Sequence, residues 1–148
     1  MNTSEEIKKL AELRLEEAQI LLENGKTNGA FYLLGYTIEL YLKYKICKLL
    51  NIENLFDESC NLRKKYFDGR NPFFSHDLNT LLVFSGLKLK FDEAKSHDKI
   101  LFKTTSLLVD VWSEKSRYDI QPKKEEDVRA SIELLKNENG LLSWIQKN

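Results

Sequence analysis

The chain has 148 residues, of which 42% are apolar and 31% charged, a composition typical of one globular domain and not of a disordered segment. Lys and Arg together number 23, as do Asp and Glu, so the formal net charge is zero and no overall positive field favours binding to a nucleic-acid duplex. The two cysteines, Cys47 and Cys60, are too few for a disulfide scaffold and lack metal-ligand spacing.

The sequence predicts a single cytoplasmic domain over residues 1–148. No apolar run approaches the roughly 20 residues that span a bilayer, so we expect no membrane contact. The charged start of the chain lacks the apolar stretch of a signal peptide. With two histidines and no phosphate-binding glycine loop or zinc motif, the sequence gives no reason to expect a metal or a cofactor.

Helical spacing dominates the first third of the chain. Thr3 followed by Glu6 is a capping-box pattern, and the apolar residues behind it predict an amphipathic helix of about six turns that ends near Gly25. A second helix is predicted over residues 28–50, with two apolar stripes. One stripe is Phe31, Leu34, Ile38, Leu42 and Leu49, and the other is Ala30, Leu33, Leu40, Tyr44 and Cys47. Two stripes predict burial on two sides, either in the centre of a bundle or also at a subunit interface.

The rest of the chain is less regular. Residues 51–75 mix turn residues with aromatics and predict an excursion with one short helix. Ser75 is the expected cap of a third helix that ends at Gly86, and residues 98–118 predict a long fourth helix. Residues 123–147 predict a fifth, in which Gly140 permits a local break. The expected fold is an all-α, antiparallel up-and-down bundle of four to five helices.

Three local features carry the candidate functional residues. The second helix contains Glu39 and Lys43, which at a spacing of four form an ion pair worth a few tenths of a kcal/mol on a helix surface and far more consequential if buried. His76 stands at the start of the third helix, where capping or packing is the simplest role. Arg117 and Tyr118 end the fourth helix, where Arg117 either pairs with an acid such as Glu39 or binds a phosphate.

Taken in order, these features resemble the HEPN family of small prokaryotic helical bundles. The residues that carry the resemblance are Ala30, Phe31, Glu39, Leu42 and Lys43, then His76 and Leu78, then Arg117 and Tyr118. The resemblance implies a homodimer that partners a small nucleotidyltransferase or acts in a toxin–antitoxin or defence system. Many members are metal-independent ribonucleases, in which an Arg is followed five to seven residues later by a His.

The ribonuclease motif is incomplete here, because Pro122, Lys123 and Lys124 stand where the His after Arg117 is required. We therefore expect a non-catalytic binding module, with Glu39, Lys43, Arg117 and Tyr118 contacting a partner protein, a nucleotide-containing ligand or RNA. One alternative is a ribonuclease with a displaced site, using Arg70 and His76, which have the required spacing, or Arg117 with His76. Another is a structural bundle in a larger complex. The basic and aromatic residues 62–70 are expected to form a solvated loop, with contact to single-stranded RNA as the alternative.

Overall fold

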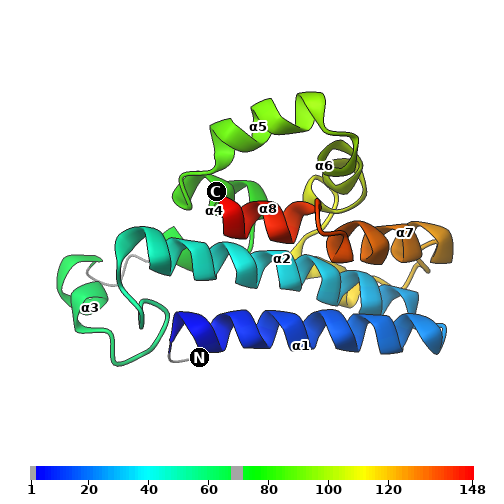
Figure 1. Cartoon of the computed structure of the whole chain (residues 1–148). Helices are drawn as coiled ribbons and strands as arrows, with labels where there is room; N and C mark the ends of the chain where they lie inside the picture. The colour runs from blue at the N-terminus through cyan, green and yellow to red at the C-terminus, as the bar shows by residue number, and fades with distance from the viewer. Residues whose placement is uncertain (1–2, 68–71) are drawn as a thin grey trace.

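The computed structural model describes residues 3–67 and 72–148, which form helices and no strand, so the all-α fold class is confirmed (Figure 1). The elements are α1 (Ser4–Glu23), α2 (Thr27–Leu50), α3 (Asn61–Phe67), the 3₁₀ turn η1 (Pro72–Phe74), α4 (Leu78–Phe84), α5 (Lys88–His97), α6 (Lys99–Thr104), the π-helical turn η2 (Thr105–Val109), the 3₁₀ turn η3 (Glu114–Tyr118), α7 (Glu125–Lys136) and α8 (Leu141–Lys147). Within the described residues, no helix is long and apolar enough to cross a membrane.

Helices α1 and α2 form an antiparallel hairpin, as the sequence predicts. The capping box of Thr3 and Glu6 is present, and Gly25 takes the positive φ of +72° that turns the chain into α2. At the far end of the hairpin the Lys48 ammonium lies 3.2 Å from the Glu5 carboxylate and 2.8 Å from that of Glu53. These contacts join the start of α1 to the end of α2.

Helix α2 is buried on two sides by the chain itself. Ala30, Leu40 and Cys47 of the second apolar stripe are fully buried, as are Leu34 and Ile38 of the first. These residues of the second stripe are therefore covered within the protomer by helices that pack around α2, whereas its other members, Leu33 and Tyr44, are partly buried.

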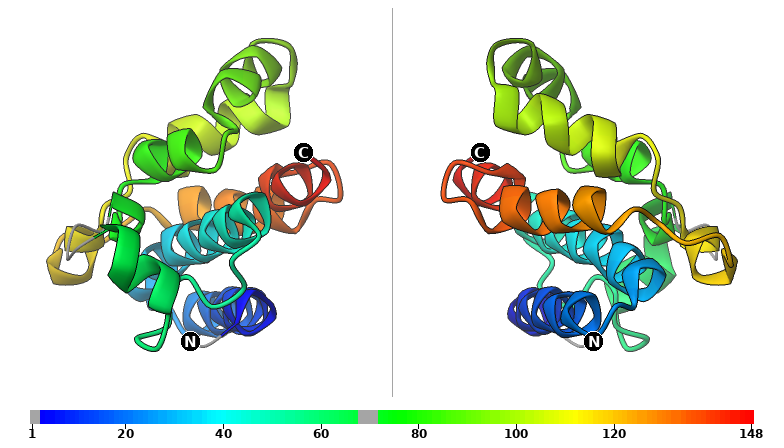
Figure 2. Two further views of the ribbon diagram at one scale, coloured as in Figure 1. Left: turned by 90° about the vertical axis from the view of Figure 1, so that its left-hand side faces the viewer. Right: turned by 90° about the vertical axis from the view of Figure 1, so that its right-hand side faces the viewer.

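The antiparallel bundle holds for α1 and α2 but does not describe the whole chain. Helices α7 and α8 lie along α2 and run in the same direction as α2 (Figure 1). Helices α4, α5 and α6 follow one another in an arch on the side of α2 away from α1, as both views of Figure 2 show.

The predicted fourth helix is wrong in its length. Helix α6 begins where the sequence predicts, and the Asp98 carboxylate caps it by accepting hydrogen bonds from the amides of Ile100 and Leu101. After Thr104 the helix widens into a π turn, in which the Asp110 amide donates to the Thr105 carbonyl, and the chain then leaves for η3. The resulting displacement puts Trp112 and η3 on the flank of α2.

Two further boundaries refine the predictions. The cap of α4 is Asp77 and not Ser75, because the Asp77 carboxylate accepts from the Thr80 amide, whereas the Ser75 hydroxyl accepts from the amide of Asp77 itself. The predicted fifth helix divides at Gly140, where a Cβ atom would lie 2.2 Å from the Leu134 carbonyl oxygen. A side chain at this position would clash in the observed, broken conformation, so the break between α7 and α8 requires glycine.

Candidate ligand-binding site

The Glu39–Lys43 pair is buried and not a surface pair. Glu39 is 1% exposed and Lys43 5% exposed, and the Lys43 ammonium lies 2.5 Å from Glu39 Oε1. The ammonium also faces the ring of Phe56, with 5.6 Å between Nζ and the ring centroid. Charges at this depth persist only when they are paired, so each of the two groups depends on the other.

His76 is the second partner of the same carboxylate. Its Nδ1 lies 3.0 Å and 3.1 Å from the two oxygens of Glu39, a geometry in which the Nδ1–H donates to the carboxylate. The other ring nitrogen, Nε2, lies 3.3 Å from the Glu114 carboxylate at the start of η3. The half-exposed imidazole thus joins a buried acid on α2 to a half-exposed acid on η3. Of the two roles expected for His76, capping falls to Asp77, the N-cap of α4.

A cleft of about 440 Å³ opens beside this imidazole. It is lined by Ser75, His76, Asp77, Trp112, Ser113, Glu114 and Lys115. One wall is the segment before α4 and the other is the end of the π turn with η3. The lining includes both signs of charge, Lys115 as a cation and Asp77 and Glu114 as acids.

Trp112 fixes one end of the cleft wall against α2. Its indole Nε1 donates to the Tyr32 carbonyl at 3.0 Å, and its ring stacks on the Tyr32 ring at a centroid distance of 6.1 Å. The indole lies directly over Gly35, where a Cβ atom would be 2.2 Å from the ring. Glycine is therefore required for this close approach.

Asn28 fixes the other end. Its side-chain amide donates to the carbonyls of Asp119 and Gln121, and its Oδ1 accepts from the Lys123 amide at 2.8 Å. The segment that contains η3 is therefore attached to the first turns of α2 at both ends.

Arg117 and Tyr118 lie on the exposed side of η3. The Arg117 guanidinium lies 4.8 Å from the centroid of the Tyr118 ring, and Tyr118 is 72% exposed. The nearby Tyr118 phenol, with a smaller contribution from Tyr32, raises the pKa of Arg117 above its ordinary value. Among the described residues Arg117 forms no ion pair with Glu39, which was one of the two roles that the sequence left open.

The remaining sequence candidates lie elsewhere. Arg70 is outside the described residues. The loop predicted over residues 62–70 is wrong for residues 62–67, which belong to α3. In this helix the Arg63 guanidinium lies 4.9 Å from the centroid of the Phe74 ring, and Tyr66 is exposed.

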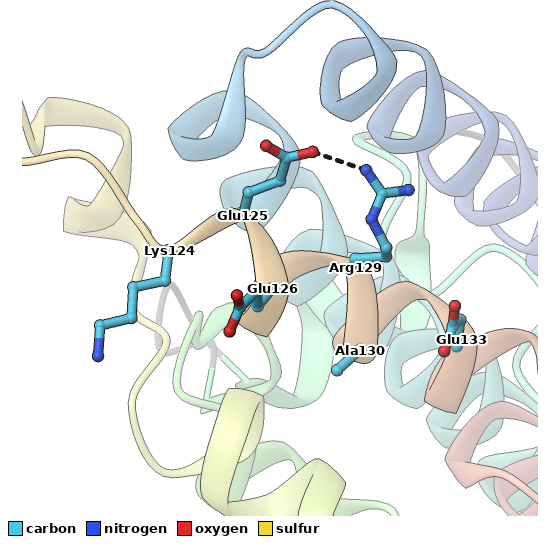
Figure 3. A pocket seen from close by; sticks show the side chains of 6 residues that line it. All are labelled: Lys124, Glu125, Glu126, Arg129, Ala130 and Glu133. Carbon is cyan, nitrogen blue, oxygen red and sulfur yellow. Dashed lines mark hydrogen bonds and ion pairs between the residues drawn. The ribbon is translucent and has the colours of Figure 1, made fainter.

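A second hollow, of about 700 Å³, lies along the outer face of α7 (Figure 3). Its lining is Lys124, Glu125, Glu126, Arg129, Ala130 and Glu133. Glu125 and Arg129 pair with each other at 2.7 Å, and both are more than half exposed. The hollow contains no buried polar group, and we do not assign it as the functional site.

Sequence reasoning did not single out Trp112, Glu114 or Lys115, although they stand just before Arg117 and Tyr118 in the chain. Within the described residues, no cluster of three potential ligands could hold a metal ion. Comparison with protein-family models, with curated proteins and with solved structures finds no significant match.

Proposed function

We propose that this protein is a non-catalytic HEPN-like module that binds a nucleotide-containing ligand at the cleft beside η3. The observation that carries the proposal is the direct contact of Glu39, Lys43 and His76, three residues of the family pattern, across 37 positions of sequence. Glu39 and His76 are brought together only by the fold. A buried network of this kind is better explained by a functional site than by an isolated ion pair on a helix surface.

The ligand chemistry follows from the side chains that remain accessible. Arg117 and Lys115 offer cations for a phosphate, and the exposed Tyr118 ring offers a face on which a base can stack. His76 contributes a ring whose orientation is set by the Glu39 carboxylate behind it. Phosphate binding by Lys115 and Arg117, with a base on Tyr118, is the arrangement we propose.

The proposed module is non-catalytic because the reactive nitrogen of His76 is already engaged. Nε2 faces the Glu114 carboxylate at 3.3 Å, and a general base must instead reach the proton that it removes.

A metal-independent ribonuclease is the second candidate, and the orientation of His76 favours it. A histidine held at Nδ1 by a buried carboxylate, with Nε2 directed into a cleft, has the arrangement of many acid–base catalysts. In this reading Glu114 moves aside when RNA binds, and Lys115 or Arg117 stabilises charge on the phosphate.

The homodimer and a partner such as a small nucleotidyltransferase, in a toxin–antitoxin or defence system, are part of the leading proposal. An adjacent nucleotidyltransferase gene would support that partnership. Because Leu40 is buried within the protomer, a dimer would have to use another surface, and light scattering of the purified chain measures whether one forms.

The deciding experiment combines binding and cleavage. A fluorescein-labelled single-stranded RNA of about eight nucleotides is titrated with the protein in EDTA, and its anisotropy and length are both followed. We expect saturable binding of intact RNA, weakened roughly tenfold by Arg117→Ala or Tyr118→Ala, about 1.4 kcal/mol, and unchanged by Arg129→Ala on α7.

Cleavage that is lost in His76→Ala would replace the leading proposal by the ribonuclease. Absence of both binding and cleavage would contradict both candidates and leave a structural bundle.

A further inference from the structure

The His76 imidazole lies between two carboxylates, one buried and one half-exposed. Nδ1 lies 3.0 Å from Glu39 Oε1, and Nε2 lies 3.3 Å from Glu114 Oε2. An ionised carboxylate accepts hydrogen bonds and donates none, whereas a neutral imidazole carries a proton on only one of its nitrogens. Both contacts are therefore favourable at the same time only when the ring carries two protons and a positive charge.

The charges around the ring favour this second proton. They come from α2, from the segment before α4 and from η3, and they are Glu39, Lys43, Asp77, Glu114 and Lys115. These are three acids against two ammonium groups, so one proton on the imidazole balances the set. The nearby Tyr36 phenol stays neutral, because burial and, to a lesser degree, Glu39 raise its pKa. Among these side-chain types imidazole is the one that ordinarily changes its charge between about pH 5 and 8.

The two contacts of the ring differ in what replaces them when a proton is lost. The Glu39 side chain is 1% exposed, so water cannot take the place of the Nδ1–H that donates to it. The Glu114 side chain is 44% exposed and can turn toward solvent. The neutral ring should therefore keep its proton on Nδ1. Its unprotonated Nε2 then faces the Glu114 carboxylate with no hydrogen between them, and this contact is the one that is lost.

The contact with Glu114 holds the turn that carries the proposed ligand residues. Glu114 is the first residue of η3, which ends at Tyr118. Trp112 before this turn and Asp119 after it are attached to α2 by hydrogen bonds. The contact with His76 attaches the chain to α2 between these two points, and it depends on a proton, whereas the other two do not.

We infer that His76 is a proton-dependent clamp on the cleft. As an imidazolium it holds Glu114 and the start of η3 against α2, and as a neutral ring it releases Glu114 and presents Nε2 to the cleft. The inference rests on the proposed function only in taking this cleft as the binding site. Because the clamp is measured on the protein without RNA, the clamp and RNA binding can fail separately.

The first measurement follows the ring nitrogens of both histidines by nitrogen-15 NMR of the full chain between about pH 5.5 and 8.5. His97, the other histidine of the chain, is exposed at the end of α5 and serves as the internal control. We expect two protons on the His76 ring at the acid end of this range and a single proton, on Nδ1, at the alkaline end. A neutral ring with its proton on Nε2, or a ring that is neutral throughout the range, would overturn the inference.

Glu114→Gln and Glu114→Ala test whether the Glu114 carboxylate holds the second proton on the ring. At about pH 6.5, the ratio of protonated to neutral His76 should fall roughly two- to fivefold in both variants, as expected for a half-exposed ion pair, and the ratio for His97 should not change. The matched control is Glu126→Ala, which removes an exposed acid of α7 and should leave both ratios unchanged. An unchanged ratio for His76 in the Glu114 variants would contradict the clamp.

Hydrogen exchange of the Ser116 and Asp119 amides, which donate to the carbonyls of Ser113 and Ser116, measures the release of η3. At about pH 5.5 exchange should be roughly two- to fivefold slower in the unchanged protein than in Glu114→Ala, and at about pH 8 the two should be equal. Glu114→Gln should exchange more slowly than Glu114→Ala at about pH 8, because its amide N–H can donate to the neutral Nε2. Equal exchange in all three proteins at both pH values would overturn the inference, and circular dichroism checks that each variant is folded.

Discussion

At the scale of single residues, the Glu39 carboxylate shows how burial changes what a charge does. The same acid accepts from the Lys43 ammonium and from the His76 ring, and it is almost fully removed from solvent. Removal of the acid would leave the Lys43 ammonium buried without its counter-charge, which is the costly outcome for a buried pair.

We therefore expect Glu39→Ala to lower the free energy of unfolding by about 3–5 kcal/mol. Urea denaturation followed by circular dichroism measures this. Replacement of both partners, Glu39→Leu with Lys43→Leu, should recover most of the loss, because apolar groups of similar volume carry no desolvation penalty. If Glu39→Ala lowers the free energy of unfolding by less than about 1 kcal/mol, the pair behaves as a solvent-exposed ion pair, and the prediction is wrong.

A second prediction concerns the contact between Gly35 and Trp112. A methyl group at residue 35 would overlap the indole ring, so Gly35→Ala should displace Trp112 and cost about 1–3 kcal/mol despite the better helix propensity of Ala. In a Trp144→Phe background, Trp112 fluorescence should shift to the red as its ring becomes solvated.

Gly29→Ala is the control for the glycine substitution. Its Cβ would meet the flexible end of Leu21 at 3.2 Å, a contact that a small side-chain movement relieves. Unchanged emission in both variants would contradict the proposed role of the indole contact.

The spacing of Glu39 and Lys43 was enough to predict that they pair, but not that they are buried. Their burial depends on the segment before α4, whose path through residues 51–75 has no periodic signal. The contact of His76 with Glu39 depends on the same segment. The two residues are 37 positions apart, which is beyond the reach of helical periodicity. In the sequence Glu114 and Lys115 cannot be distinguished from ordinary surface charges. Only the path of the chain after η2 places them beside His76.

At the scale of elements, the long amphipathic segments were predictable and the broken ones were not. Helices α1 and α2 have continuous stripes and clear end signals at Thr3 and Gly25. Helix α5 was not predicted, because its largely charged sequence contains one buried residue, Phe91. Residues 98–118 have helical spacing through the π turn, so spacing alone cannot show where the helix ends.

The cap of α4 provides an element-scale prediction. The Asp77 carboxylate accepts from the Thr80 amide at 2.6 Å, so Asp77→Ala should cost about 1 kcal/mol of stability. Ser75→Ala removes a hydroxyl that accepts from the Asp77 amide outside the helix and should cost less. Thermal denaturation of the two variants measures the order, and a larger loss for Ser75→Ala would restore Ser75 as the stronger cap.

At the scale of the whole molecule, the sequence predicted the all-α class but not the relative directions of the helices or the order in which they pack. Stripes on α2 and α7 show that each helix is buried, yet they do not show that the two run in the same direction (Figure 1). That arrangement requires the chain to travel from the end of α2 back to its beginning, and the arch of α4, α5 and α6 provides the return path.

The whole fold should lose stability at alkaline pH. Burial raises the pKa of the Cys47 thiol to about 11, and burial also raises the pKa values of Tyr36 and Tyr41. Groups with a raised folded-state pKa contribute stability that is complete below the unfolded pKa and is lost as pH rises through the folded value. The free energy of unfolding should therefore fall between about pH 9 and 11, with the thiol accounting for at most roughly 2–3 kcal/mol.

Urea denaturation at a series of pH values measures this loss. Cys47→Ala should start from a lower stability but decline less steeply over the same range, because its contribution to the titration is removed. An identical decline in the two proteins would assign the alkaline loss to the tyrosines.

The fit of Trp112 over Gly35 also has an evolutionary consequence. Position 35 and position 112 divide a fixed volume between α2 and the wall of the cleft, so neither can vary independently. In a lineage that keeps this packing, a larger residue at position 35 requires a smaller one at position 112. The two positions should therefore covary in size, and a descendant that loses the indole is free to lose the glycine.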